Sequence, residues 1–190
     1  VRSSAASDVY KRQTPLVSNL WPQFMVDPAF AACFGQVIVE HAQMLRQERQ
    51  VIFTLRSGAP LDKNLCARLL ASLQPDYEGF ELRIQNLFGY AMLDEAALRD
   101  LMEEMKRDGV PINGFLDRCK INIIGQKITI GVCHGTKFLQ EMHFEKLLAE
   151  RIAAHTGVTP QVTLQSAVSE AEQPVSYTHL RAHETSAHLV

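Results

Sequence analysis

The stretch that decides the fold is Cys119–Cys133, which reads CKINIIGQKITIGVC. Two runs of alternating apolar residues flank Gly125 and Gln126, and a glycine at the first central position of a two-residue loop is typical of a type II′ β-hairpin. In this register one face of the hairpin carries only Cys119, Ile121, Ile123, Ile128, Ile130 and Val132. The opposite face carries Lys120, Asn122, Lys127 and Thr129. A hairpin with one apolar face predicts a helical layer packed against that face. Under this layer Ile121, Ile123, Ile128 and Ile130 are predicted to be nearly fully buried.

The helical run that follows the hairpin supplies this layer. It carries an apolar stripe and ends at Gly157, a typical helix C-cap; the stripe is made of Phe144, Leu147, Leu148 and Ile152. Phe138 and Met142 fall outside the stripe, so we expect the helix to break between Gln140 and His143. A last strand is expected over residues 160–165.

The chain before the hairpin has the same order of elements. Asp27 followed by Pro28 predicts a helix start, and alternating residues predict strands at 36–40 and 50–55 that form a hairpin with a longer, charged loop. A helix from residue 62 and a strand over 80–87 complete the first half. Asp94 then caps a second clear helix over 94–108. Each half therefore reads helix, strand, strand, helix, strand.

Two pairs of segments support an internal repeat. Residues 51–58 (VIFTLRSG) align with residues 128–135 (ITIGVCHG) without a gap, and residues 82–85 align with 162–165. Chance similarity between two β-rich stretches is the alternative. The predicted fold class is α+β, with two tandem αββαβ units, residues 14–90 and 91–172, whose antiparallel hairpins pack on helices.

Both ends of the 190-residue sequence are set aside. Residues 1–13 and 173–190 resemble translated read-through of sequencing adaptors, and they lack helical or strand periodicity. Three histidines in the second segment, His179, His183 and His188, could alternatively form a metal-binding tract. Without these ends, 15 Lys and Arg face 19 Asp and Glu, a net charge of −4. An acidic balance disfavours general nucleic-acid binding but leaves room for a local basic face.

The sequence shows no catalytic signature. A glycine-rich phosphate loop and a G-x-S-x-G motif are absent, and outside the two ends set aside above the sequence has no H-x-x-x-H pair. No apolar run reaches the about 18 residues that span a membrane. We therefore predict no catalytic residues, no metal, no cofactor and no membrane association.

Cysteines and aromatic residues are given structural roles. The four cysteines lie in apolar segments without metal-site spacing and are predicted to be buried free thiols, as in a cytoplasmic protein. A metal at Cys133, His134 and His143 is the alternative. Trp21, Phe24 and Met25 are predicted to anchor the N-terminal segment on the core, rather than to stack on a base; the three lie within five residues.

An αββαβ unit with a broken second helix is the skeleton of the α-first KH fold. KH domains clamp the nucleic-acid backbone with a G-x-x-G loop at the helix break. Here the break reads Gln140-Glu141-Met142-His143, which has no glycine and has an acidic residue that would repel phosphate. The fold is therefore expected to be KH-like without the KH clamp.

Several short stretches resemble the N-terminal region of PolC-type bacterial DNA polymerase III alpha subunits. They are residues 30–39, 50–57, 80–88 and 121–135, and the resemblance covers about residues 14–172. It implies a non-catalytic module of a replicative polymerase, related in fold to the polymerase-binding end of the clamp-loader tau subunit and to KH-like domains. The intact parent would be a DNA polymerase with a 3′–5′ exonuclease, and this stretch would carry none of its catalytic residues.

Two functions are left open at this point. The first is a cytoplasmic protein-interaction module that ties the polymerase to the replisome, with the tau subunit as partner. The alternative is a degenerate KH pair that binds single-stranded DNA weakly through Lys120, Lys127 and Lys137.

Overall fold

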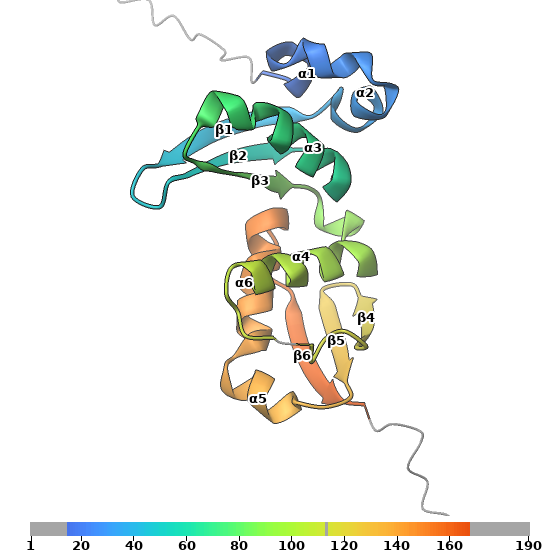
Figure 1. The fold of residues 1–190 in the computed structure, drawn as a ribbon. Coiled ribbons are helices and arrows are strands. Elements are labelled where there is room, and N and C mark those ends of the chain that lie inside the picture. The colour runs from blue at the N-terminus through green and yellow to red at the C-terminus, as the bar shows by residue number, and fades with distance from the viewer. Residues whose placement is uncertain (1–14, 113, 168–190) are drawn as a thin grey trace, which may run out of the picture.

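The computed structural model describes residues 15–112 and 114–167, so the adaptor-like segments predicted at 1–13 and 173–190 lie outside the described residues. The described chain is an α+β protein with two three-stranded sheets (Figure 1). Its strands are β1 (Ile38–Leu45), β2 (Gln50–Arg56), β3 (Glu81–Leu87), β4 (Lys120–Ile124), β5 (Lys127–Val132) and β6 (Gln161–Ser166). Its α-helices are α1 (Val17–Leu20), α2 (Pro28–Phe34), α3 (Lys63–Leu73), α4 (Glu95–Arg107), α5 (Thr136–Glu141) and α6 (Phe144–Thr156). Short 3-10 helices are η1 (Pro22–Val26), η2 (Gln74–Tyr77) and η3 (Tyr90–Met92).

The two sheets have the same topology. β1 pairs antiparallel with β2 and β2 pairs parallel with β3, and β4, β5 and β6 repeat this arrangement. Val51 lies opposite Leu82, while Ile128 lies opposite Val162. These are the residues that the internal alignment makes equivalent. The sequence repeat is therefore matched by a repeat of the strand pairing.

The β4–β5 hairpin has the predicted register. Ile123 lies opposite Ile128 and Ile121 lies opposite Ile130, around a turn in which Gly125 has φ 57°. Ile128 and Ile130 are fully buried, as expected for the central strand of a sheet. Near-complete burial of Ile121 and Ile123 was also predicted and is wrong, because β4 is an edge strand and both side chains are only half-buried.

Strand β1 differs from the sequence prediction. It was expected over 36–40 but spans Ile38–Leu45, which shortens the expected long loop to residues 46–49. The pairing with β2 shifts between Val39 and His41, so a β-bulge interrupts the alternation on which the prediction relied.

Two hydrophobic clusters hold the chain together. One is built from residues 17–84, with Phe34, Leu55 and Leu69 almost completely buried. The other is built from residues 88–164, with Leu98 and Ile152 among its fully buried members. Burial of each such side chain contributes about 1.5–3 kcal/mol.

The helices begin as their sequences predict. Asp27 and Asp94 accept hydrogen bonds from the backbone N–H groups of Ala29 and Ala97, at 2.9 and 2.8 Å. Gly157 ends α6 with φ 72°. The predicted apolar stripe of α6 holds except at Leu147, which is 37% exposed. Successive residues of a helix point about 100° apart, so Leu147 is turned away from the side on which Leu148 is buried.

α6 connects the two units in space. Figure 1 shows it packed beside α4, with its C-terminal end reaching β3 of the first unit. Among the described residues, no helix combines the length and the apolar character that crossing a membrane would require.

Candidate functional site

The three lysines predicted to bind nucleic acid do not form one compact patch. All three are exposed. Lys120 lies opposite Gly131, whereas Lys127 lies opposite Ile124 beside the turn, so the two stand at opposite ends of the hairpin. At about 3.3 Å per residue this separation is roughly 13 Å along the strand. Lys137 belongs to a different element, α5.

The predicted helix break lies where the sequence places it. α5 ends at Glu141 and α6 begins at Phe144. The backbone N–H of Met142 donates to the carbonyl of Phe138 at 3.1 Å, and that of His143 donates to Gln140 at 2.9 Å. His143 has φ 55°, a left-handed conformation that is uncommon outside glycine. These two amides are already used within the chain and are not directed at a ligand.

The cysteines and histidines do not converge on a metal site. Cys133 is exposed, and the His134 ring meets the Phe115 ring edge-on with 5.6 Å between the ring centres. Across residues 15–112 and 114–167, no three His, Cys, Asp or Glu side chains come together in a metal-binding arrangement.

The prediction of four buried thiols holds only in part. Cys119 is buried, Cys33 and Cys66 are half-buried, and Cys133 is exposed because it follows β5 on the polar side of the hairpin. Burial raises the pKa of the Cys66 thiol to about 12, so this group stays protonated and unreactive near neutral pH.

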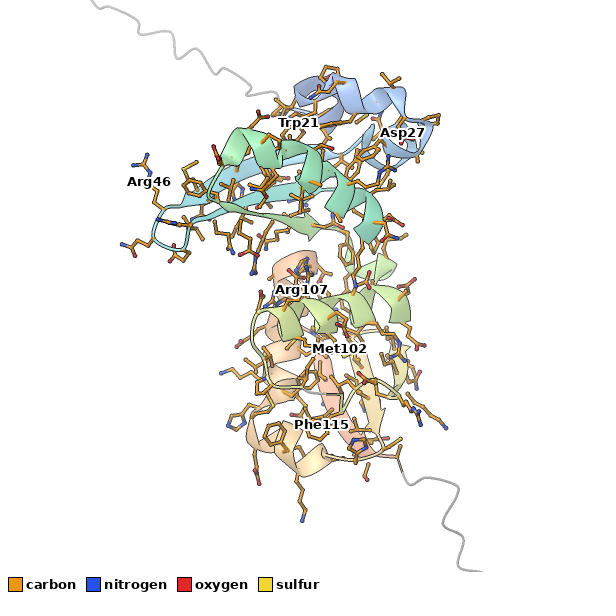
Figure 2. All side chains as sticks on the ribbon, viewed as in Figure 1. Trp21, Asp27, Arg46, Met102, Arg107 and Phe115 are labelled. Atoms are coloured by element: carbon orange, nitrogen blue, oxygen red, sulfur yellow. The ribbon has the colours of Figure 1, made fainter. Side chains whose placement is uncertain are left out.

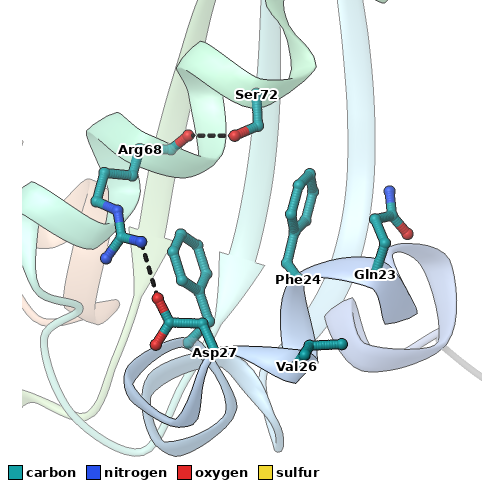
Figure 3. A pocket seen from close by; sticks show the side chains of 7 residues that line it. Gln23, Phe24, Val26, Asp27, Arg68 and Ser72 are labelled. Carbon is teal, nitrogen blue, oxygen red and sulfur yellow. Dashed lines mark hydrogen bonds and ion pairs between the residues drawn. The ribbon is translucent and has the colours of Figure 1, made fainter.

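The N-terminal aromatic residues pack on the first core, as predicted. The Trp21 ring meets Phe53 edge-on at 5.7 Å. Beside them a shallow hollow is closed by Arg68, whose guanidinium lies 4.7 Å from the centre of the Phe30 ring and 2.8 Å from Asp27 (Figure 3). The hydrogen bond from Arg68 lowers the pKa of Asp27. This contact fastens α3 to the N-terminal segment.

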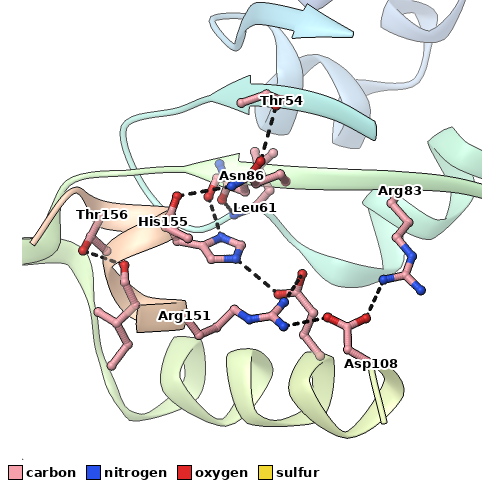
Figure 4. Close-up of polar contacts among 12 residues, drawn as sticks. Thr54, Leu61, Arg83, Asn86, Asp108, Arg151, His155 and Thr156 are labelled. Atoms are coloured by element: carbon pink, nitrogen blue, oxygen red, sulfur yellow. Dashed lines mark hydrogen bonds and ion pairs between the residues drawn. The ribbon is translucent and has the colours of Figure 1, made fainter. Parts of the chain in front are cut away.

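A polar network at the junction of the two units was not predicted. Its centre is His155, near the end of α6 and 5% exposed. The Nδ1 atom of His155 lies 2.8 Å from the carbonyl oxygen of Asn86 in β3, and its Nε2 atom lies 3.4 Å from the Oε2 atom of Glu104 in α4 (Figure 4). Both partners are acceptors, so both contacts are hydrogen bonds only when both ring nitrogens carry a proton.

Arginines from both units extend this network. Arg151 lies 3.4 Å from Glu104 and 2.7 Å from Asp108, and Arg83 of β3 pairs with the other oxygen of Asp108. Burial raises the pKa of Glu104, but the hydrogen bond from His155 and the charge of Arg151 outweigh it, and the pKa ends below its usual value. The pKa of Asp108 is likewise lowered, because Arg151 and Arg83 outweigh the effect of burial.

A cavity of about 750 Å³ lies next to this network, between α3, β3 and α4. Its wall is mixed: apolar side chains such as Leu61, Leu70 and Leu101 alternate with charged ones such as Lys63 and Glu103. Figure 2 shows Arg107 at this junction, with Met102 further inside the second unit. The carboxylates of Glu104 and Asp108 are paired with cations and kept ionised, so neither is poised to act as a general acid near neutral pH. The geometry suits binding or bracing of the two units more than catalysis.

The network has a sequence signal that was overlooked. Glu104 in α4 and Asp108 at the C-cap of this helix are four residues apart, as are Arg151 and His155 in α6, and residues at this spacing share one helix face. An acidic pair on one helix and a basic pair on another indicate that the two faces meet. The contribution of Arg83 could not be found in this way, because it depends on how the two units pack.

Comparisons of the chain with protein-family models, with curated proteins and with solved structures find no match.

Proposed function

We propose that residues 14–172 are a non-catalytic, cytoplasmic module of a replicative DNA polymerase of the PolC type, and that the module works by binding another replisome protein. The proposal takes its family from the resemblance of residues 30–39, 80–88 and 121–135. It takes its mode of action from the helix break. The tau subunit of the clamp loader is the proposed partner.

The observation that carries the proposal is the use of the amides at the break between α5 and α6. A KH-like unit with the order β4-β5-β6 and a helix broken at this point would hold a phosphate by backbone N–H groups of its loop. Here the N–H groups of Met142 and His143 donate within the chain, and Glu141 is exposed beside them. A phosphate would meet a negative charge and few free donors, which favours a protein partner.

One observation favours the second function, weak binding of single-stranded DNA. Phe115 and Phe138 lie with their ring centres 5.4 Å apart, and Phe138 is 42% exposed next to Lys137. Exposed aromatic rings beside a lysine can stack on bases and contact the backbone. Lys120 and Lys127 would add charge at other points of the same unit.

The two functions are separated by parallel titrations of the chain with tau and with single-stranded DNA. We expect measurable binding to tau, and DNA binding no tighter than the non-specific range of about 10⁻⁴ to 10⁻⁶ M at physiological salt. Lys137→Ala should leave tau binding unchanged, with Lys106→Ala as a matched surface control. Tight, salt-sensitive DNA binding that Lys137→Ala abolishes and Lys106→Ala does not, together with no binding to tau, would overturn the proposal.

A further inference from the structure

The outer edge of β1 is paired only at its start, at Ile38 and Val39. The segment around Leu16 pairs antiparallel with the start of this edge. The N–H of Val17 donates to the carbonyl of Val37, and the N–H of Val39 donates to the carbonyl of Pro15, each over 2.8 Å. From Glu40 to Leu45, no backbone hydrogen bond arrives from any described element other than β2. An open strand edge is a template for a further strand.

The residues that present this open edge can be identified from the pairing. Val37 and Val39 direct backbone groups outward and side chains into the core. After the bulge, Ala42 lies opposite Phe53 and Met44 opposite Val51, both of which are core residues. Because backbone groups and side chains alternate together along a strand, Ala42 and Met44 are the residues whose N–H and C=O groups point outward.

We propose that a second copy of this chain pairs with β1 through this edge, antiparallel and about a two-fold axis at Gln43. Ala42 then lies opposite Met44 of the second copy, and Met44 lies opposite Ala42 of the second copy. Each outward-facing residue meets an outward-facing residue, and each small side chain meets a large one. Two three-stranded sheets join into one sheet of six strands, with the isologous contact that a two-fold axis requires.

Charge and length both fit a second copy. Glu40 and Arg46 are each three residues from Gln43, so the two-fold axis brings Glu40 of one copy near Arg46 of the other, and opposite charges meet on both sides. Glu40 already pairs with Arg56 of its own chain, so Arg46 of the second copy would join an existing ion pair. The open stretch begins at the bulge and ends at the turn, and a second copy contributes a strand of the same length. Figure 2 shows Arg46 at the tip of the hairpin, away from Met102 and Phe115 of the second unit. That unit contacts the sheet through α6 at β3, the edge opposite β1.

The test is sedimentation velocity of the full chain over a concentration series, with two variants and a matched control. Met44 and Met92 are both 47% exposed, but only Met44 lies on the β1 edge. We expect the unchanged chain and Met92→Lys to dimerise, and Met44→Lys to raise the dimer dissociation constant about tenfold or more, equivalent to about 1.4 kcal/mol. Ala42→Pro removes an outward-pointing N–H without touching the ladder to β2, and it should have the same effect.

Three outcomes would overturn the inference. The unchanged chain could stay monomeric at every concentration, or it could dimerise equally in both β1 variants. It could also dimerise only after residues 1–13 are deleted, which would place that segment on the edge instead. Circular dichroism verifies that each variant is folded. If one of the two β1 variants does not fold, the other is enough to test the inference. A monomer that binds tau would sink this inference and leave the proposed function standing, whereas a dimer that does not bind tau would do the reverse.

Discussion

The two αββαβ units pair their strands alike but cross from the second strand to the third in different ways. In the first unit one continuous helix, α3, makes the crossing, and the Asp62 side chain caps it by accepting a 2.9 Å hydrogen bond from the N–H of Leu65. In the second unit the crossing is broken into α5 and α6 around His143. The strand register follows from alternating apolar residues, whereas the helical crossing needs only to cover the same face of the sheet. The crossing can therefore differ between the two units more than the register can.

The extra length of the second crossing has a structural consequence. α6 covers its own sheet with Phe144, Leu148 and Ile152, and it also carries Arg151 and His155 to the junction with the first unit. In the first unit α3 contributes Lys63 to the junction through an exposed ion pair with Asp100. The second unit thus supplies the buried part of the contact, and the first unit supplies mainly β3.

The largest expected effect tests whether the two cores are equivalent. Ile130 and Phe53 occupy matching positions in the repeat and are almost completely buried. Ile130→Ala should lower the free energy of unfolding by about 2–5 kcal/mol, and Phe53→Ala by about 3–5 kcal/mol. Urea denaturation followed by circular dichroism measures both. A loss below about 1 kcal/mol at either site would show that its core is not closely packed.

The next effect concerns the junction that only the second unit's long helix can make. Glu104→Gln removes the charge that faces His155 and Arg151, and leaving the buried His155 side chain without its charged partner costs about 1–3 kcal/mol. The pKa of Glu104 in the folded chain lies below its usual 4.5, so its contribution to stability is complete above about pH 4.5 and disappears as the pH falls through the folded value.

Unfolding free energy measured against pH should therefore fall less steeply in acid for Glu104→Gln than for the unchanged chain. The neighbouring Glu103, which is exposed on the same helix, provides the control variant Glu103→Gln. If the unfolding free energy falls equally steeply with pH in acid for both variants, Glu104 does not stabilise the junction through its charge.

A smaller change in stability is expected at the break between α5 and α6, which α3 lacks. His143→Gly should be neutral or slightly stabilising, because φ 55° costs a side chain about 1–2 kcal/mol that glycine avoids, partly offset by the greater freedom of glycine in the unfolded chain. Gln140→Gly, within the helix α5, should instead cost about 1 kcal/mol. Thermal unfolding compares them, and a larger loss for His143→Gly would mean that its side chain holds the break.

The smallest change in stability is expected on the solvent-exposed face of the second hairpin. Lys120→Ala and Lys127→Ala should each change the free energy of unfolding by less than about 0.5 kcal/mol, because both side chains are exposed. The same urea experiment measures them beside Ile130→Ala. If either lysine variant approached the loss seen for Ile130→Ala, the contrast between the two faces of the hairpin would be lost.

Local patterns in the sequence predicted most of the elements. The hairpin register, the Asp27 and Asp94 caps, the Gly157 end of α6 and the break near His143 each depend on residues close together in the chain. The errors fall where a local pattern is interrupted or where position in the sheet matters. The bulge after Val39 hid the second half of β1, and the edge position of β4 left Ile121 and Ile123 half-exposed.

By itself the sequence determined the class α+β, the repeated order of strands and helices, and the register of the second hairpin, because alternation, caps and turn residues act over a few positions. Only the tertiary structure decided which strand edges are open and which charges meet. Arg83 and Asp108 are 25 residues apart, and His155 and Asn86 are 69 apart. Such contacts depend on how two independently patterned units pack together, and no short-range pattern carries that information.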